Sequence, residues 1–275
     1  SKESFEKLNS QDWAAAELQN PINENEPFLR GSLFTSLFSA VNNNVKKGYS
    51  AIKVFEAGNV FKKEKRGFAQ SLHLSGIIYH HEPRQTWSQQ KFTYDFFSLK
   101  AEILKLLHTL GMHNAAFQKN NNLMPFNENA LEIFVGKQKI GIIGEIDLSM
   151  TEKLIKKAAF GFEIYPEQIS LFSKNPQIKK ISKFPLSTRD INILIDKSIA
   201  YQEIESLIVQ GKIKYLVSFN LMNTFEGNDI PKGSISMTLR FIFQSNEKSL
   251  LDSEISRGTN KVIELLKKNL KIHIR

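Results

Sequence analysis

The sequence predicts an α+β protein built in two parts. Three observations point to this class: helical and strand-like apolar patterns alternate along the 275 residues, short turns join the strand-like runs, and one breaker-rich segment divides the chain. That segment, Ser173 to Lys183, contains the run Ser-Lys-Asn-Pro and four lysines. We therefore predict a first domain over residues 1–172, a linker over 173–180 and a second domain over 181–275.

The first domain is predicted to open with a helix followed by a hairpin. Five apolar residues recur at helical spacing before an asparagine run and Gly48 end the helix: Leu33, Phe34, Leu37, Phe38 and Val41. Two strand-like runs follow, Ala51 to Phe61 and Leu72 to Tyr79. The charged segment Lys62 to Gly67 joins them, which is typical of a hairpin with an exposed loop.

A longer helix is predicted over Tyr94 to Leu110, because apolar residues recur at helical spacing and Gly111 follows as a C-terminal cap. We expect it to bury Phe97, Ile103, Leu104, Leu107 and Leu110. Three further strands complete the domain: Leu131 to Val135, Lys139 to Ile146 after a turn at Gly136-Lys137, and Phe160 to Ile164. Helices on an antiparallel sheet make this an α+β domain.

The second domain shows a β-α-β-β-α-β order, which is that of a ferredoxin-like unit. Its predicted elements are a strand around Ile191 to Ile195, a helix over Gln202 to Gln210, strands over Tyr215 to Asn223 and Ser234 to Gln244, a helix over Asp252 to Leu270, and a short strand over Ile272 to Ile274.

One face of this second sheet is predicted to be open and polar. The alternation in its third strand places Ile235, Met237, Leu239, Phe241 and Phe243 on one side, and Ser236, Thr238 and Arg240 on the other. An open polar sheet face is where single-stranded RNA binds in several families. A plain solvated surface is the alternative.

Composition excludes several classes of protein. Lys and Arg number 37 against 28 Asp and Glu, a net charge of +9, with 41% apolar residues, so the chain is globular and its basic surplus favours a polyanionic partner. Without cysteine there is no disulfide, thiolate metal site or cysteine nucleophile. No apolar run approaches the roughly 20 residues that span a bilayer, so we expect a cytoplasmic protein with no membrane partner.

Short segments occur in order across both predicted domains: Asn20-Pro21; Leu29-Arg30-Gly31-Ser32-Leu33; Phe55-Glu56-Ala57-Gly58-Asn59-Val60-Phe61; Asp95 with Lys100; Gly141 with Gly144-Glu145-Ile146; Phe184-Pro185 with Arg189-Asp190; Gly227; Gly233 with Ser236; and Arg275. In this order and spacing the chain resembles the C-terminal part of the beta subunit of bacterial phenylalanyl-tRNA synthetase. Because it begins with Ser1 rather than Met, we expect an excised piece of a longer chain.

The resemblance implies that the first domain is a catalytic-like module with a class II synthetase-like sheet that performs no chemistry. The family's alpha subunit binds phenylalanine and ATP, with Mg²⁺, in a heterotetramer of two alpha and two beta chains. A working class II site needs arginines to clamp ATP phosphates, and between Gly67 and Thr188 the sequence has only Arg84. We therefore predict no catalytic residue, no metal site and no cofactor bound by this chain, with the alpha subunit and a second beta subunit as partners.

The resemblance also implies that the second domain is a ferredoxin-fold anticodon-binding domain for the anticodon arm of tRNA(Phe). The family segment Leu-Phe-Asp-x-Tyr-x-Gly matches Leu221 to Gly227, so Asn223 replaces the carboxylate and Phe225 the tyrosine. A phenyl ring still stacks on a base, whereas an amide offers one acceptor oxygen, so base discrimination is weaker or reassigned. The predicted tRNA-binding residues are Asn223, Phe225, Arg240, Arg189, Ser236 and Arg275. Glu226 puts in doubt a phosphate contact at a position that is often basic in the family.

Several residues admit a structural alternative. Arg189 beside Asp190 suits either a salt-bridged strand or an RNA contact, and the lysines near the end of the last helix suit either its dipole or tRNA phosphates. His80 and His81 are not expected to bind one metal ion together, because adjacent residues of a strand point to opposite faces. Gly141 to Gly144 favours close packing over a nucleic-acid clamp.

Two alternative functions follow from the same sequence. The chain would be an autonomous ATP-dependent class II-like ligase if its first domain held a working site. It would be a structural or oligomerisation module if the second sheet made no RNA contact. The apolar residues of Leu33 to Val41 suit either the core or a subunit interface, and Glu56 suits a structural role.

Overall fold

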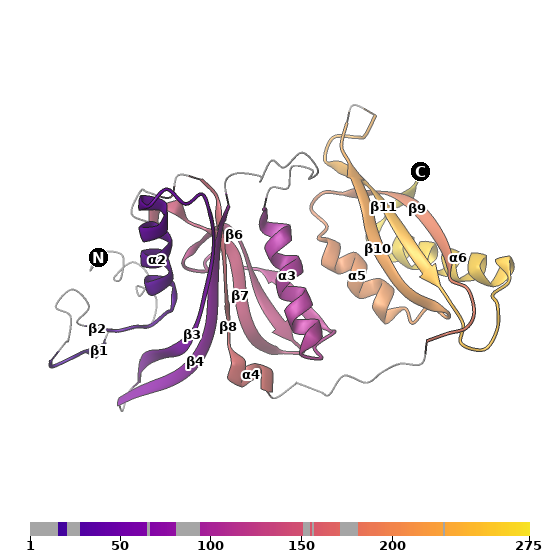
Figure 1. Ribbon diagram of the computed structural model, residues 1–275. Coiled ribbons are helices and arrows are strands. Elements are labelled where there is room, and N and C mark those ends of the chain that lie inside the picture. The colour runs from indigo at the N-terminus through magenta and orange to yellow at the C-terminus, as the bar shows by residue number, and fades with distance from the viewer. Residues whose placement is uncertain are drawn as a thin grey trace. The chain divides into compact units, whose positions relative to one another are not determined.

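The chain folds as two compact units, Ser1–Gln177 and Ile178–Arg275 (Figure 1). The computed structural model describes residues 16–20, 28–64, 67–80, 94–150, 155, 157–170, 181–227 and 229–275. Among these residues no helix has both the length and the apolar character needed to cross a bilayer.

The first unit is built on a six-stranded antiparallel sheet in the order β3-β4-β8-β7-β6-β5. Its strands are β3 (Ala51–Glu64), β4 (Gly67–His80), β5 (Ala115–Lys119), β6 (Phe126–Val135), β7 (Gln138–Ile146) and β8 (Ala159–Ile164). The other elements are α2 (Phe34–Lys46), α3 (Phe96–Thr109), a 3₁₀ turn (Leu148–Met150), α4 (Pro166–Ser170) and the small β1-β2 pair (Ala16–Glu17, Phe28–Leu29).

Helices α2 and α3 pack on opposite faces of this sheet, as Figure 1 shows. On β4, Ile77 belongs to the core beneath α2, and its neighbour Ile78 belongs to the core beneath α3. Successive side chains of a strand point to opposite faces, so one strand supplies both cores. The sheet is therefore a central layer covered on both sides.

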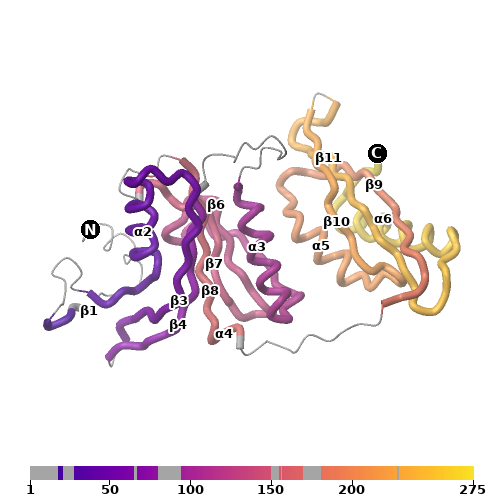
Figure 2. Tube along the Cα trace, in the orientation of Figure 1, coloured from indigo at the N-terminus to yellow at the C-terminus, as the bar shows by residue number. Residues whose placement is uncertain are grey.

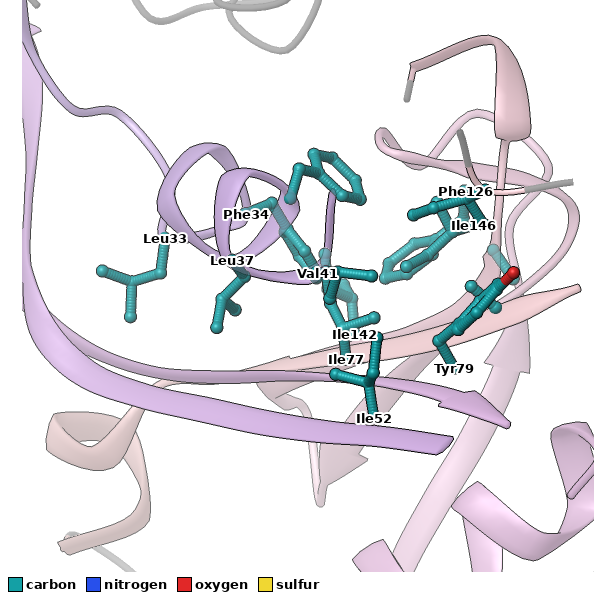
Figure 3. Close-up of a cluster of buried hydrophobic side chains, with 14 of the residues drawn as sticks. Leu33, Phe34, Leu37, Val41, Ile52, Ile77, Tyr79, Phe126, Ile142 and Ile146 are labelled. Carbon is teal, nitrogen blue, oxygen red and sulfur yellow. The ribbon is translucent and has the colours of Figure 1, made fainter. Parts of the chain in front are cut away.

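The apolar residues whose spacing predicts helix α2 are also the residues that this helix contributes to the core beneath it (Figure 3). Figure 3 shows Leu37 and Val41 of α2 beside Ile52 and Ile77 of the sheet. The ring of Phe34 meets the edge of the Phe126 ring with centroids 5.5 Å apart. This apolar stripe is thus core within the unit.

Helix α3 begins at a capping box in which the Asp95 carboxylate accepts a 2.7 Å hydrogen bond from the Ser98 amide. Its buried residues are Leu99, Ile103 and Leu107. The expectation that Phe97 is buried is wrong, because its side chain is 72% exposed. Phe97 lies two residues before Leu99, about 200° around the helix, and therefore faces away from the sheet.

The hairpin strands are longer than predicted. Pairing between β3 and β4 continues to Glu64 and Gly67, so Lys62 to Glu64 form strand rather than loop. The traces of β3 and β4 run side by side in Figure 2. Charged side chains are compatible with this because they are exposed there. Strand β5 is not among the predicted elements; it is only five residues long and has one buried side chain, Phe117.

Two glycines of β7 allow close approach, as the packing alternative proposed. A Cβ atom at Gly144 would lie 2.5 Å from the Phe126 ring, and one at Gly141 would lie 2.6 Å from the carbonyl oxygen of Glu163. Such separations are sterically forbidden, so these positions require glycine for packing.

The second unit has the predicted β-α-β-β-α-β order. Its elements are β9 (Ser187–Asp196), α5 (Tyr201–Gln210), β10 (Leu216–Phe225), β11 (Ser234–Phe243), α6 (Asp252–Leu270) and β12 (His273–Ile274). The antiparallel sheet has the order β10-β11-β9-β12. Both helices pack on one face, where Ile204 of α5 and Val262 of α6 join the inward residues of β9 and β11 in one core. The other face of the sheet is therefore not covered by α5 or α6.

Candidate nucleic-acid interface

The side chains that point away from α5 and α6 form a mainly polar surface, which we call the open face. Directly opposed residues of an antiparallel pair lie on the same side of a sheet, so the register assigns its members. They are Thr188, Asp190, Asn192, Leu194 and Asp196 of β9, Ser234, Ser236, Thr238, Arg240 and Ile242 of β11, Ser218, Asn220, Asn223 and Phe225 of β10, and His273 of β12.

Arg240 lies on the inner strand β11 of this face and is held by Asp190, directly opposite on β9. Its Nε and Nη2 atoms donate hydrogen bonds of 2.8 and 2.7 Å to the two carboxylate oxygens. This bidentate arrangement fixes the plane of the guanidinium. Nη1 makes no hydrogen bond to the described residues and remains available to a ligand.

The two charges perturb each other. The hydrogen bond and positive charge of Arg240 hold the pKa of Asp190 below its usual value, and Asp190 raises the pKa of Arg240 in return. Their side chains are 42% and 41% exposed. Water screens so open a pair, which therefore orients the arginine more than it stabilises the fold.

Asn223 lies on the edge strand β10, at the open-face position after Asn220, which is the register partner of Arg240. The register partner of Asn223 is Thr238, whose hydroxyl donates a 2.8 Å hydrogen bond to the side-chain oxygen of Asn192. A register shift between Leu221 and Asn223 leaves Met222 as an extra residue, so a bulge returns Asn223 to the open face. Its amide makes no side-chain hydrogen bond to a described residue and can donate to, or accept from, a base edge.

Phe225 ends β10 opposite Ser236, and 51% of its surface is exposed. Gly227 packs against its ring, since a Cβ atom there would lie 2.7 Å from the tip of the ring. The glycine thus lets the following turn fold close to the aromatic side chain. The result is an exposed ring, supported on one side, next to Asn223 on the same strand.

Glu226 follows at the end of the face and forms an ion pair with Lys197, which lies just after β9. The pair neutralises the negative charge that the sequence places there. It also engages Lys197, so this pair of side chains supplies no net positive charge for a phosphate.

Arg189 does not share the open face. It is paired in register with Phe241, which is buried beneath the helices, and its guanidinium forms an ion pair with Asp252 at the start of α6. The salt-bridged alternative is therefore the one observed, although the partner is Asp252 rather than Asp190. Arg275 lies at the opposite edge from β10, where its amide donates to the carbonyl of Asn192.

The structure thus places Asn223, Phe225, Ser236 and Arg240 on the open face, with Arg275 opposite Asn192 at the far edge of that face, and Arg189 on the helix side. Sequence reasoning missed the roles of Asp190 and Asn192 as cross-strand partners. The alternation of β9 contained the signal, because both residues have the parity of its polar side. The register between β9 and β11 determines which residues of the two strands lie opposite each other. The pattern of either strand alone does not predict it.

The first unit holds a different set of polar contacts. Burial raises the pKa of Glu56, but hydrogen bonds from Ser36 and Arg30 and the charge of Arg30 lower it below its usual value overall. Glu56 thus ties the segment before α2 to β3, in agreement with a structural role. Within the described ranges no three His, Asp or Glu side chains gather as metal ligands. Arg84, His81 and the side chain of His80 lie outside the described residues.

Two family models match the chain in sequence order. The phenylalanyl tRNA synthetase beta chain CLM domain matches residues 1–165, and the ferredoxin-fold anticodon binding domain matches residues 182–275. The first of these models alone matches more than half of the chain.

Curated relatives agree with these matches. The phenylalanine-tRNA ligase beta subunit of Wigglesworthia glossinidia brevipalpis is 32% identical over 264 residues, which cover 93% of this chain and 32% of that protein. The beta subunit of Lactobacillus acidophilus is 27% identical, over 94% of this chain and 33% of that protein. The chain therefore spans about a third of the length of the curated relatives it matches.

Among solved structures, a pyrrolysyl-tRNA synthetase from Desulfitobacterium hafniense is similar with a TM-score of 0.44 and 14% identity, over 62% of this chain and 58% of that one. The family models and the curated relatives, in contrast, cover both units of the chain. The chain belongs to the phenylalanyl-tRNA synthetase beta chain family.

Proposed function

We propose that this chain is the tRNA-binding and alpha-subunit-docking part of a phenylalanine-tRNA ligase beta subunit. The observation that carries the tRNA role is the juxtaposition of Asn223, Phe225 and Arg240 on one open sheet face of the anticodon-binding unit. The curated relatives bear the name of this ligase's beta subunit, and docking to the alpha subunit follows from that name.

Each residue has a role in this proposal. Phe225 stacks on a base of the anticodon, a contact that needs only an exposed ring. Asn223 reads the edge of a neighbouring base through its amide, and Ser236 adds a hydroxyl beside the ring. Arg240 contacts phosphate or base through its available Nη1 atom, with Asp190 holding its plane.

We place the ATP-dependent esterification of phenylalanine on the alpha subunit, in a cytoplasmic heterotetramer of two alpha and two beta chains. The described residues of the first unit do not fit an ATP and Mg²⁺ site: Arg30 is engaged by Glu56, and the acidic side chains do not converge as ligands. We therefore derive no catalytic step through this chain.

Binding of a tRNA(Phe) anticodon arm tests the tRNA role. The log of the affinity is expected to fall linearly with the log of the salt concentration. Phe225→Ala is expected to lose about 1–3 kcal/mol of binding free energy, and Arg240→Ala is expected to weaken binding as well. Fluorescence anisotropy with a labelled arm measures both effects.

Two matched controls separate the face from general effects. Phe97→Ala removes an exposed phenyl ring from the first unit, and Arg189→Ala removes a guanidinium from the helix side of the second sheet. Neither should change affinity as much as the corresponding open-face variant. If Phe225→Ala and Arg240→Ala bind like the unmodified chain, the proposed RNA face is wrong. Calorimetry with ATP and phenylalanine tests the assignment of chemistry, and saturable micromolar binding to this chain would overturn it.

A further inference from the structure

A cavity of about 460 Å³ lies wholly within the first unit, apart from the open face. It is lined by β4, by the loop before β6, by the start of β7, and by the segment from the end of β8 into α4. Its size is that of a small-molecule site. Nothing in the proposed tRNA role uses it.

One wall of the cavity is a buried carboxylate. The Glu163 side chain is 9% exposed and accepts hydrogen bonds from Ser75 Oγ at 3.0 Å and Ser32 Oγ at 3.4 Å. Both hydroxyls bind the same oxygen, Oε1. Oε2 makes no hydrogen bond to a described residue and is the oxygen left for a ligand.

His73 lines the cavity next to this carboxylate, and its side chain is also 9% exposed. Its Nε2 atom lies 3.2 Å from Ser71 Oγ. Its Nδ1 atom lies 3.1 Å from Glu163 Oε1 but is not aligned with it, and it has no hydrogen-bond partner among the described residues. Buried polar atoms are normally paired, so an orphan nitrogen beside a cavity points to a ligand group.

The other lining residues indicate the charge of the ligand that the cavity would accept. Lys139 is the cavity's lysine, and it is engaged by Glu132 at 2.5 Å, so it does not neutralise Glu163. Tyr165 packs against the His73 ring, and burial together with the charges of Glu163 and Glu132 raises its pKa, which keeps the phenol neutral. A neutral aromatic ring attracts cations.

Apolar side chains complete the lining. Leu72, Leu123, Met124 and Ile142 form an apolar part of the lining. The rest is polar: beside Glu163 and His73 it includes a second carboxylate, Glu167, which accepts a 3.3 Å hydrogen bond from the Leu72 amide. Burial of a carboxylate is costly unless a positive charge pairs with it. An ammonium group on an apolar body satisfies both parts of the lining.

We propose that this cavity binds a small organic cation, with the ammonium group on Glu163 Oε2 beside His73 and Tyr165 and the apolar body against Met124 and Ile142. Binding here is separate from tRNA recognition, because every lining residue belongs to the first unit. Failure of one proposal therefore leaves the other standing.

Benzylamine, benzyl alcohol and benzoate are suitable probes, since they share a ring and differ in charge. The measurement is titration of the 275-residue chain, followed by the NMR signals of the Met124 and Ile142 methyl groups. Ile193, in the core of the second unit, is the internal reference. Saturable shifts are expected with benzylamine, with affinity at least tenfold weaker for benzyl alcohol and benzoate. Absence of saturation with benzylamine, or equal binding of the alcohol, overturns the proposal.

Glu163→Gln keeps the shape and an acceptor oxygen but removes the charge, and it should weaken benzylamine binding at least tenfold. Glu56→Gln is its matched control, because Glu56 is a partly buried carboxylate of the same unit that does not line the cavity. Leu72→Trp, introduced at a side chain that is 40% exposed, should fill the cavity without disturbing the core. If folded Glu163→Gln or Leu72→Trp protein binds benzylamine like the unmodified chain, the site is not this cavity.

Discussion

Arg240 and Asp190 face each other across β11 and β9 and share two hydrogen bonds, of 2.8 and 2.7 Å, on the open face of the second sheet. The positive side chain most suited to RNA is thus already partnered by a carboxylate. A phosphate that approaches Arg240 also approaches Asp190. In the proposed tRNA role, binding at this face depends on how phosphate and Asp190 compete for Arg240.

Replacing Asp190 with asparagine is expected to tighten binding of the anticodon arm. The change removes the negative charge that competes with phosphate, and the released Arg240 steepens the dependence of log affinity on log salt by about 0.7 to 0.9. Asp252→Asn is the control, because it removes the partner of Arg189 on the helix side. Weaker binding by Asp190→Asn would instead mean that Asp190 positions the guanidinium for a base.

Asp190 should titrate below the usual aspartate value of 3.8. The hydrogen bond and charge of Arg240 depress the pKa of Asp190 in the folded state. The pair therefore stabilises the fold at pH values above the pKa that Asp190 has in the unfolded chain. That stabilisation is lost as the pH falls through the lower pKa of the folded protein. NMR titration of the side-chain carboxyl carbon measures the midpoint. Arg240→Gln should return it toward 3.8, and Arg189→Gln should leave it unchanged.

Gly227→Ala is expected to weaken RNA binding without destabilising the fold. The new methyl group would displace the tip of the Phe225 ring, which is exposed and free to move. Unfolding free energy should stay within about 0.5 kcal/mol of the original. In a Phe225→Ala background the same change should have no further effect on affinity, and an additive loss would contradict the role of the ring.

Phe34→Ala should destabilise the first unit by about 3–5 kcal/mol, because the ring is fully buried against Phe126 and its loss leaves a cavity. Phe97→Ala deletes the same group from an exposed position of α3 and should change stability by no more than about 0.5 kcal/mol. Urea unfolding followed by core methyl signals of the first unit measures both. Similar losses in the two variants would contradict the burial assigned to these helices.

Periodicity predicted the elements whose core contacts are regular. The limits of α6 match the prediction at both ends, Asp252 and Leu270, because its apolar stripe is long and continuous. The short strand β5, the charged end of β3 and the first residues of β4 escaped prediction, since pairing with a neighbour rather than local pattern makes them strands. Phe97 has the hydrophobicity of a core residue, but its position about 200° around the helix from Leu99 leaves it exposed.

The candidate interface was predictable to the extent that strand parity determines it. Parity placed Ser236 and Arg240 on the polar side of β11. It could not reveal that Asp190 holds Arg240, because that contact joins residues fifty positions apart. Arg189 shows the converse: charge suggested RNA contact, and its register with Phe241 directs it to the helix side.

The bulge at Met222 also affects how readily one copy of the protein pairs with another through the edge of the sheet. Strand β10 pairs only with β11 among the described strands, and an exposed edge of this type is a template for adding a strand from another chain. Two register irregularities along β10 distort that edge and oppose such intermolecular pairing. The strand that presents Asn223 and Phe225 can therefore stay accessible to nucleic acid while remaining a poor seed for aggregation.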